Sequence, residues 1–177
     1  MQFFIGIVPP VDVKEKIIRL QNTFSDRPAI EPHITVKSLS GLTADKVWIP
    51  KVEEYIKRQH LFPIKLGDTN WFDEAVLFLS VASPKIHLLH KGLLEIVDPG
   101  PELRREHFEG QYYVPHLTLA ELKKGIPKTE LQSMELNAKQ ELAEIPEFYA
   151  TFARIFVRAD SEGPCVKLMD IPFDAGP

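Results

Sequence analysis

The chain has 177 residues, and 44% of them are hydrophobic, which is enough to form the core of one domain and excludes a disordered chain. A formal net charge of −4 excludes a protein that holds long nucleic acid on a broad basic face. The single cysteine, Cys165, excludes an internal disulfide, and no apolar run reaches the length of a membrane span, so we expect a cytoplasmic protein.

The N-terminal part of the chain alternates between strand and helix patterns. Residues 3–8 are rich in β-forming side chains and end at two prolines, which predicts a strand. Asp12, with Glu15 three residues later, predicts the capping box of a helix. Residues 32–38 predict a second strand. A helix is expected within residues 44–59, with a kink or a new start at Pro50.

The rest of the chain repeats this alternation. Residues 62–68 and 75–82 predict two strands with a turn between them, and Ser83-Pro84 predicts the start of a helix. Residues 98–110 hold two prolines and two glycines, which indicates a loop. A strand over 112–121, a helix over 128–142 and two strands over 146–158 and 165–171 follow.

Two short segments of the chain are nearly identical. Residues 32–36 read Pro-His-Ile-Thr-Val, and residues 115–119 read Pro-His-Leu-Thr-Leu. Side chains two apart on a strand share one face, so each segment places a histidine and a threonine on one face and two aliphatic side chains on the other. Two copies in a chain with six histidines predict a site built from His33, Thr35, His116 and Thr118.

The order of elements around these segments also repeats, as strand, proline, helix, loop and Pro-His-apolar-Thr. We therefore predict an α+β fold of two duplicated units related by a pseudo-twofold axis, with two antiparallel sheets lining a central cleft. The whole chain forms one bilobal domain. Its first unit spans about 1–74, its second about 75–144, and a C-terminal hairpin about 145–173.

Paired imidazoles and hydroxyls suit the cleavage of a phosphodiester. Imidazole titrates near neutral pH, so one histidine can accept the proton of the attacking oxygen while the other protonates the leaving oxygen. Hydroxyl groups can donate hydrogen bonds to the phosphoryl oxygens and stabilise the charge that builds there. This chemistry needs no metal, and we predict no cofactor.

The paired motifs and the duplicated layout resemble the two-histidine (2H) phosphoesterase superfamily, and within it the 2'-5' RNA ligase-like proteins and cyclic phosphodiesterases. The resemblance covers essentially the whole chain. It implies that His33 and His116 are catalytic and that Thr35 and Thr118 contact phosphate. It also implies, as substrate, a nucleotide or a short RNA end with a 2',3'-cyclic phosphate or a 2'-5' linkage. Which histidine is the acid, whether hydrolysis or ligation dominates, and which substrate is physiological stay open.

Further residues are candidates for substrate contact. Strand alternation extends the His33 face to Lys37, a candidate third phosphate ligand or an exposed strand-end lysine, whereas the matching position in the second copy is Ala120. Arg104 and Arg105 lie in the loop over 98–110 and either contact a terminal phosphate or are solvated. Tyr112 shares the alternation of His116 and is a candidate for stacking on a base, and a β-bulge would exchange it with Tyr113.

Two other functions compete with a phosphoesterase. A binding module would hold a nucleotide or an RNA end without turnover. A metal-dependent hydrolase would use several of the six histidines, but His87 and His90 have no carboxylate or cysteine placed to complete a metal site, so we predict no metal site. In each case we expect a monomer that binds neither membranes nor long nucleic acid.

Overall fold

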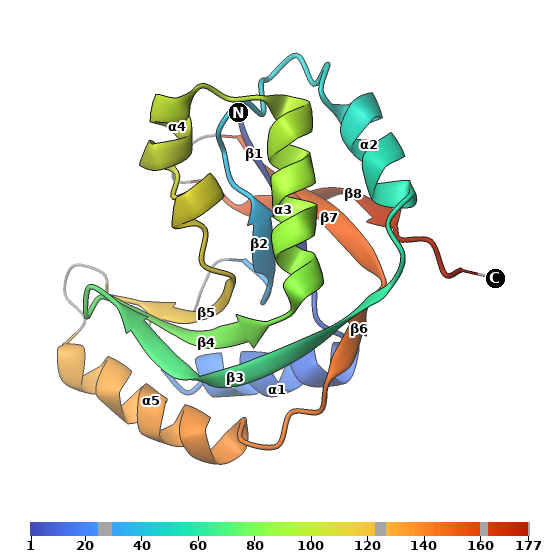
Figure 1. Ribbon diagram of the computed structural model, residues 1–177. Helices are drawn as coiled ribbons and strands as arrows, with labels where there is room; N and C mark the ends of the chain where they lie inside the picture. Colours follow the sequence, from blue (N-terminus) through green and yellow to red (C-terminus); the bar gives the residue numbers. More distant parts are fainter. Residues whose placement is uncertain (25–29, 123–126, 160–162, 177) are drawn as a thin grey trace.

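The computed structural model describes residues 1–24, 30–122, 127–159 and 163–176, and in this part of the chain eight strands form one antiparallel sheet (Figure 1). The strand order is β6-β3-β4-β5-β2-β1-β7-β8. The strands are β1 (Gln2–Ile7), β2 (Ile34–Lys37), β3 (Phe62–Phe72), β4 (Val76–Ala82), β5 (His116–Glu121), β6 (Phe148–Ala150), β7 (Phe152–Arg158) and β8 (Cys165–Pro172).

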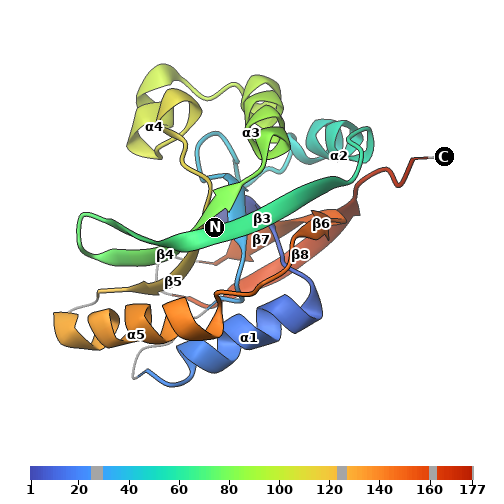
Figure 2. The same ribbon diagram turned by 60° about the horizontal axis from the view of Figure 1, so that its bottom comes forward.

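The helices cover the sheet in two pairs. They are α1 (Val11–Gln21), α2 (Ile49–Lys57), α3 (Pro84–Val97), α4 (Pro101–Glu106), the short 3-10 helix η1 (Gly110–Tyr112) and α5 (Lys128–Glu141). Helices α1 and α5 lie side by side against β5 and β3, whereas α2 and α3 contact each other, β8 and β2 (Figures 1 and 2). Among the described residues, none of the helices is both long and apolar enough to cross a membrane.

The two repeats exchange their helices. Helix α1 follows β1 in the chain but packs against β5, and α3 follows β4 but packs against β2. Each helix therefore covers the central strand of the other repeat, and a single apolar core runs through the molecule. The division into units of about 1–74, 75–144 and 145–173 stays a prediction.

The sheet curls until its two edges meet at one end. Strands β6 and β7 are separated only by Thr151, yet β6 lies at one edge of the sheet and β7 lies beside the strand at the other edge. After β8, the main chain of Asp174 exchanges hydrogen bonds with Gln59 and Leu61 at the start of β3. Figure 2 shows β3, β6, β7 and β8 converging at this end.

The α+β class and the order of the main elements agree with the sequence analysis, and several details differ. The structure has one continuous sheet where two were expected, because β2 and β5 pair with each other at Ile34 and Leu117. The expected strand over 146–158 is broken at Thr151 into β6 and β7. Strand β3 extends to Phe72, through residues that were expected to form a turn.

The predicted helix starts are partly right. Helix α2 begins at Ile49, which agrees with a start at Pro50. Helix α1 has Pro10 as its N-cap residue and no side-chain cap, so the predicted capping box of Asp12 and Glu15 is wrong. Ser83 does precede α3, but its hydroxyl donates to the Pro63 carbonyl instead of capping the helix.

Both motif strands contain a β-bulge at the same place. Gly6 pairs with Thr35 and Ile5 with Lys37, so Val36 is an extra residue in β2. Phe78 pairs with Thr118 and Leu77 with Ala120, so Leu119 is the extra residue in β5. A bulge reverses the alternation of side chains beyond it. The residue two positions after each threonine therefore turns into the core.

Candidate active site

The two motifs lie next to each other at the centre of the sheet. Ile34 of β2 pairs directly with Leu117 of β5 in an antiparallel register. Continued by one residue in each direction, this register sets His33 opposite Thr118, and Thr35 opposite His116. Directly opposed Cβ atoms in such a pair are about 4.5–5.5 Å apart. The local twofold axis therefore passes between Ile34 and Leu117, and the four polar residues surround it.

Burial confirms which face carries the polar side chains. Ile34 and Leu117 are fully buried in the core. His33, Thr35, His116 and Thr118 are only partly buried, on the opposite face of the same strands. Within the described residues, neither threonine hydroxyl has a hydrogen-bond partner, so both are free to donate to a ligand.

The two histidines are held in the same way. The Nδ1 atom of His33 lies 2.9 Å from the Glu31 carbonyl oxygen, and that of His116 lies 2.7 Å from the Val114 carbonyl oxygen. A carbonyl oxygen can only accept, so Nδ1 carries the proton in both rings when they are neutral. In both, Nε2 is then the atom that accepts or releases a proton during a reaction.

A pair of phenylalanine rings packs against each histidine. His33 contacts Phe4 and Phe156, with ring centroids 5.1 and 5.2 Å away, and these two rings stack on each other. His116 contacts Phe72 and Phe78, at 4.9 and 5.3 Å, and these rings also stack. The aromatic packing restricts each imidazole on the side away from its carbonyl partner.

These phenylalanines were missed as parts of the site. Phe78 lies in β4 opposite Thr118, but the matching position in β1, opposite Thr35, is Gly6, so Phe4 and Phe78 are not equivalent in the two repeats. The repeat in the sequence therefore gives no signal that identifies either ring. Phe72 and Phe156 carry no repeat signal either, because their strands, β3 and β7, stand in different places in the chain order.

Burial lowers the pKa of both histidines from the ordinary value of 6.5. For His33, desolvation is the largest cause, and the charge of His116 lowers the pKa further, against the hydrogen bond to Glu31. For His116, desolvation again dominates, while the Val114 carbonyl and the charge of Glu121 act in the opposite direction. The charge of His116 among the causes for His33 agrees with the register that brings the two motifs together.

Lys37 does not lie on the face of the histidines, so the prediction that it is a phosphate ligand is wrong. Its side chain is fully buried, because the bulge at Val36 turns it inward. The ammonium group lies 2.7 Å from a carboxylate oxygen of Glu109 and also donates to the Ser40 hydroxyl and to the Ser38 and Ser40 carbonyls. A buried charge needs such partners, and none of these donors is left for a substrate.

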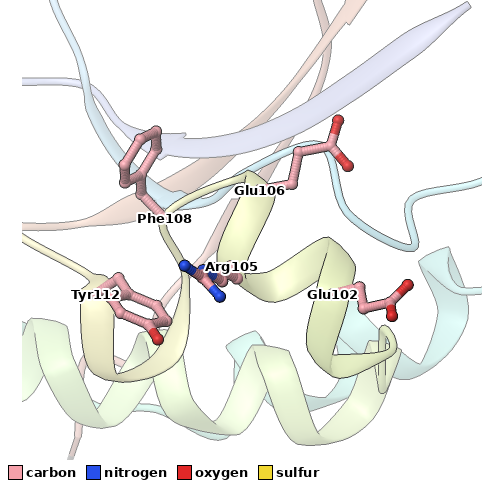
Figure 3. Close-up of a pocket in the computed structure, with 5 residues that line it drawn as sticks. All are labelled: Glu102, Arg105, Glu106, Phe108 and Tyr112. Carbon is pink, nitrogen blue, oxygen red and sulfur yellow. The ribbon is translucent and has the colours of Figure 1, made fainter.

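The segment over 98–110 contains a short helix where a loop was predicted. In α4, the Arg104 guanidinium donates to the Pro99 carbonyl and to Asp98, so it is occupied within its own segment. Arg105 has no hydrogen-bond or ion-pair partner among the described residues, and it lines a hollow of about 480 Å³ with Glu102, Glu106, Phe108 and Tyr112. Figure 3 shows its guanidinium between the Phe108 and Tyr112 side chains.

Tyr112 lies in η1 and not in a strand, so the strand alternation that made it a candidate does not apply to it. Its side chain is exposed, whereas Tyr113 is partly buried and donates its hydroxyl to the Thr35 carbonyl. His87 and His90 lie near Tyr113, and across the described ranges no three His, Cys, Asp or Glu side chains are close enough to hold a metal ion.

Comparison with known proteins shows the family of this chain. The sequence model of the 2'-5' RNA ligase superfamily matches residues 9–163. No curated protein sequence matches the chain.

Solved structures share the fold. TT0787 of Thermus thermophilus superposes with a TM-score of 0.69 at 17% identity, covering 97% of both chains. E. coli LigT, in a structure complexed with 3'-AMP, superposes with a TM-score of 0.59 at 17% identity, covering 98% of both chains. On the strength of the family match and this shared fold, the chain belongs to the 2'-5' RNA ligase superfamily, a group of 2H phosphoesterases.

Proposed function

We propose that this protein is a metal-independent phosphoesterase that hydrolyses or transesterifies 2',3'-cyclic phosphate or 2'-5' phosphodiester bonds in nucleotides or RNA ends. The observation that carries the proposal is the pairing of Ile34 with Leu117, which brings the two His-x-Thr motifs together around one local axis. Family membership supports a phosphoesterase-type function. The 3'-AMP bound to E. coli LigT supports a nucleotide as ligand.

The reaction follows from the arrangement of the four side chains. The phosphoryl group of the substrate lies between Thr35 and Thr118, whose hydroxyls donate to its non-bridging oxygens. The Nε2 atom of one histidine accepts a proton from water as the water oxygen bonds to phosphorus. The bond from phosphorus to the leaving ribose oxygen breaks, and the Nε2–H of the other histidine protonates that oxygen.

The same groups serve ligation. When the 5'-hydroxyl of a second RNA end replaces water, its oxygen bonds to the phosphorus of a 2',3'-cyclic phosphate and the bond to the 3' oxygen breaks. The product is a 2'-5' linkage with a free 3'-hydroxyl. Because the two motifs are nearly symmetric about the axis, either direction uses one histidine as base and the other as acid.

We place the substrate base beside η1. Tyr112 and Phe108 expose aromatic rings around Arg105, and aromatic faces with an arginine suit stacking by a nucleobase (Figure 3). Glu102 and Glu106 line the same hollow, so their carboxylates disfavour additional phosphates there. This supports a mononucleotide or a short RNA end as substrate.

The test is an assay in EDTA of 2',3'-cyclic nucleotides and 2'-5' linked dinucleotides. We expect wild-type turnover and a loss of at least about a hundredfold in His33→Ala and in His116→Ala, because each removes one proton-transfer group. His60→Ala is the matched control, since His60 is exposed and bonded to Asp174 away from the site. Equal rates in wild type and the His33→Ala/His116→Ala double variant refute the proposal, and tight nucleotide binding without product indicates a binding module.

A further inference from the structure

At the bulges in β2 and β5, main-chain carbonyls accept hydrogen bonds from side chains elsewhere in the chain. In β2, the Tyr113 hydroxyl donates to the Thr35 carbonyl at 2.8 Å, and His90 Nδ1 lies 2.9 Å from the Val36 carbonyl oxygen. In β5, Gln21 Nε2 donates to the Leu119 carbonyl at 3.0 Å and approaches the Thr118 carbonyl at 3.5 Å. We call these four oxygens the bulge carbonyls.

The bulge carbonyls are equivalent in the two repeats, but the side chains that bond to them are not. Thr35 and Val36 match Thr118 and Leu119, because each pair is the motif threonine and the residue after it. Their partners differ in residue type, and each comes from the opposite repeat: Gln21 from α1, and His90 and Tyr113 from α3 and the segment after η1. Different side chains therefore bond to equivalent carbonyl oxygens in the two repeats. This indicates that the bulge itself, and not a particular donor, is what both repeats require.

Two of these donors, Gln21 and His90, are buried, and Tyr113 is partly buried. Gln21 and His90 are 4% and 3% exposed. His90 donates from Nδ1 and accepts at Nε2 from the Gly110 main-chain N–H, which fixes it as the neutral Nδ1–H form. The Tyr113 ring stacks on His90 with centroids 3.9 Å apart, so the two donors to β2 support each other.

We propose that Tyr113 and Gln21 are positioning residues of the active site, which hold the bulges that aim Thr35 and Thr118 at the substrate phosphate. Without the bulge, β2 would continue its regular alternation, and Lys37 would lie on the face of Thr35 instead of in the core. With it, the main-chain carbonyl of each threonine accepts a hydrogen bond, from Tyr113 at Thr35 and from Gln21 at Thr118, while the threonine side chain lies on the face of the histidines. The inference rests on the proposed function for its effect on catalysis, but its structural part stands by itself.

The decisive experiment is a double-mutant cycle on turnover. Tyr113→Phe removes one hydroxyl, and we expect kcat to fall roughly tenfold. The reason is that displacement of the Thr35 hydroxyl, which donates to the phosphate, destabilises the transition state more than the bound substrate. In a Thr35→Ala background the same change should cost less than about twofold, whereas in a Thr118→Ala background its full cost should remain. Gln21→Met should show the reverse pattern, with its cost lost only in the Thr118→Ala background.

Two matched controls separate positioning from stability. Tyr55→Phe removes a tyrosine hydroxyl that donates to the Leu88 carbonyl, and Gln59→Met removes an amide that donates to the Tyr55 carbonyl. Both should leave kcat within about twofold of wild type. A cost of Tyr113→Phe that is equal in both threonine backgrounds, or equal to that of Tyr55→Phe, overturns the inference.

A crystal structure of Tyr113→Phe tests the inference without any assay. We expect the main chain at Thr35 to move, or to divide between two conformers, while the main chain at Thr118 stays in place. An unchanged bulge at Val36 refutes the positioning role even if the enzyme is active. If wild type turns over none of the substrates, the proposed function fails, and this structure still decides the role of Tyr113.

Discussion

The proposed reaction depends on the protonation states of the His33 and His116 imidazoles. Catalysis by one base and one acid requires one ring neutral and the other protonated at the same moment. Desolvation lowers the pKa of both rings below 6.5, and the charge of His116 lowers that of His33 further. The lowered pKa values place the gain of a proton by either ring on the acid side of 6.5.

We predict that kcat/KM for a cyclic nucleotide is bell-shaped with its maximum below about pH 6.5, and falls towards tenfold per pH unit above it. A bound phosphate anion favours the protonated rings, so the profile of kcat itself should lie at higher pH. The measurement is kcat and kcat/KM from about pH 5 to about pH 8.5. A maximum of kcat/KM above about pH 7 contradicts the lowered pKa values.

The same profiles assign the two roles. The variant that lacks the acid should lose the alkaline limb of the profile, and the variant that lacks the base should lose the acid limb. Residual turnover of His33→Ala and His116→Ala across this pH range therefore identifies which ring releases its proton. If both variants keep both limbs, the histidines are not the groups that titrate in catalysis.

Gly6 provides a test of how tightly His33 must be placed. A Cβ atom at this position would meet the His33 Cδ2 atom and a Phe156 ring carbon at 3.2 Å, and the Ile34 carbonyl oxygen at 3.3 Å. The ring has to move by a few tenths of an ångström. We predict that Gly6→Ala lowers kcat by roughly tenfold, because small errors of alignment are costly in proton transfer.

The control for Gly6→Ala is Gly100→Ala, where a Cβ atom meets nothing within 4 Å. Gly100→Ala should keep wild-type kcat. If Gly6→Ala also keeps wild-type kcat, the ring of His33 tolerates displacement, and the aromatic packing around it has no part in catalysis.

Among the elements, the segment between α3 and β5 is tied to β2 through a buried ion pair. Lys37 of β2 and Glu109, just before η1, are both shielded from solvent and lie 2.7 Å apart. Glu109 also accepts from the Ser38 main-chain N–H. Removing one member of such a pair leaves an uncompensated charge in the core, whereas removing both does not.

We predict that Lys37→Met lowers the free energy of unfolding by about 3–5 kcal/mol, and that Lys37→Met/Glu109→Met recovers much of this loss. Urea unfolding followed by circular dichroism measures both. The exposed pair of Lys57 and Glu53 in α2 is the control, and Lys57→Met should cost less than about 0.5 kcal/mol. A double variant less stable than Lys37→Met would contradict this, and would mean that the bonds Glu109 accepts from Ser38 and Ser40 outweigh the cost of its unpaired charge.

The faces of the two motif strands could be predicted from the sequence because side chains alternate along a regular strand. Alternation in residues 32–36 and 115–119 correctly separated the polar from the apolar side chains, because the bulge lies at the last residue of each motif and changes the faces only beyond it. The same alternation failed one residue later, at Lys37, because a bulge carries no local sequence mark here. The bulges depend on Gln21, His90 and Tyr113, which are distant in the chain, so only tertiary structure reveals them.

Helix α4 shows the other limit of local patterns. Its six residues, Pro101–Glu106, follow glycine and proline, contain no buried side chain and show no apolar face. A helix this short has no periodic signal to detect. The repeat itself was detectable because it depends on the order of elements, but the exchange of α1 and α3 between the repeats was not, because local sequence does not state which strand a helix will cover.

At the scale of the whole molecule, the desolvation of three histidines makes the free energy of unfolding depend on pH. Burial lowers the pKa of His90 as well as those of His33 and His116, so the folded protein disfavours a proton at three positions. In the unfolded chain these rings have a pKa of about 6.5. Below that pH the unfolded chain binds more protons than the folded one, so the free energy of unfolding falls as the pH falls.

We predict a loss of stability between about pH 6.5 and about pH 4.5, with a slope of at most about 1.4 kcal/mol per pH unit for each histidine. Carboxylates do not contribute in this window. The ion pairs of Glu31 and Asp170 lower their pKa values below the ordinary 4.5 and 3.8, so their stabilisation is lost only at lower pH.

Urea unfolding at about pH 7.5 and about pH 5.5 measures this loss, and the His33→Ala/His116→Ala double variant should show a smaller difference between the two. The remaining difference belongs to His90, whose neutral form is required by the Gly110 N–H that donates to it. Equal stability at the two pH values would mean that the three rings accept protons in the folded state. His90 would then have lost the bond that its Nε2 atom accepts from the Gly110 N–H.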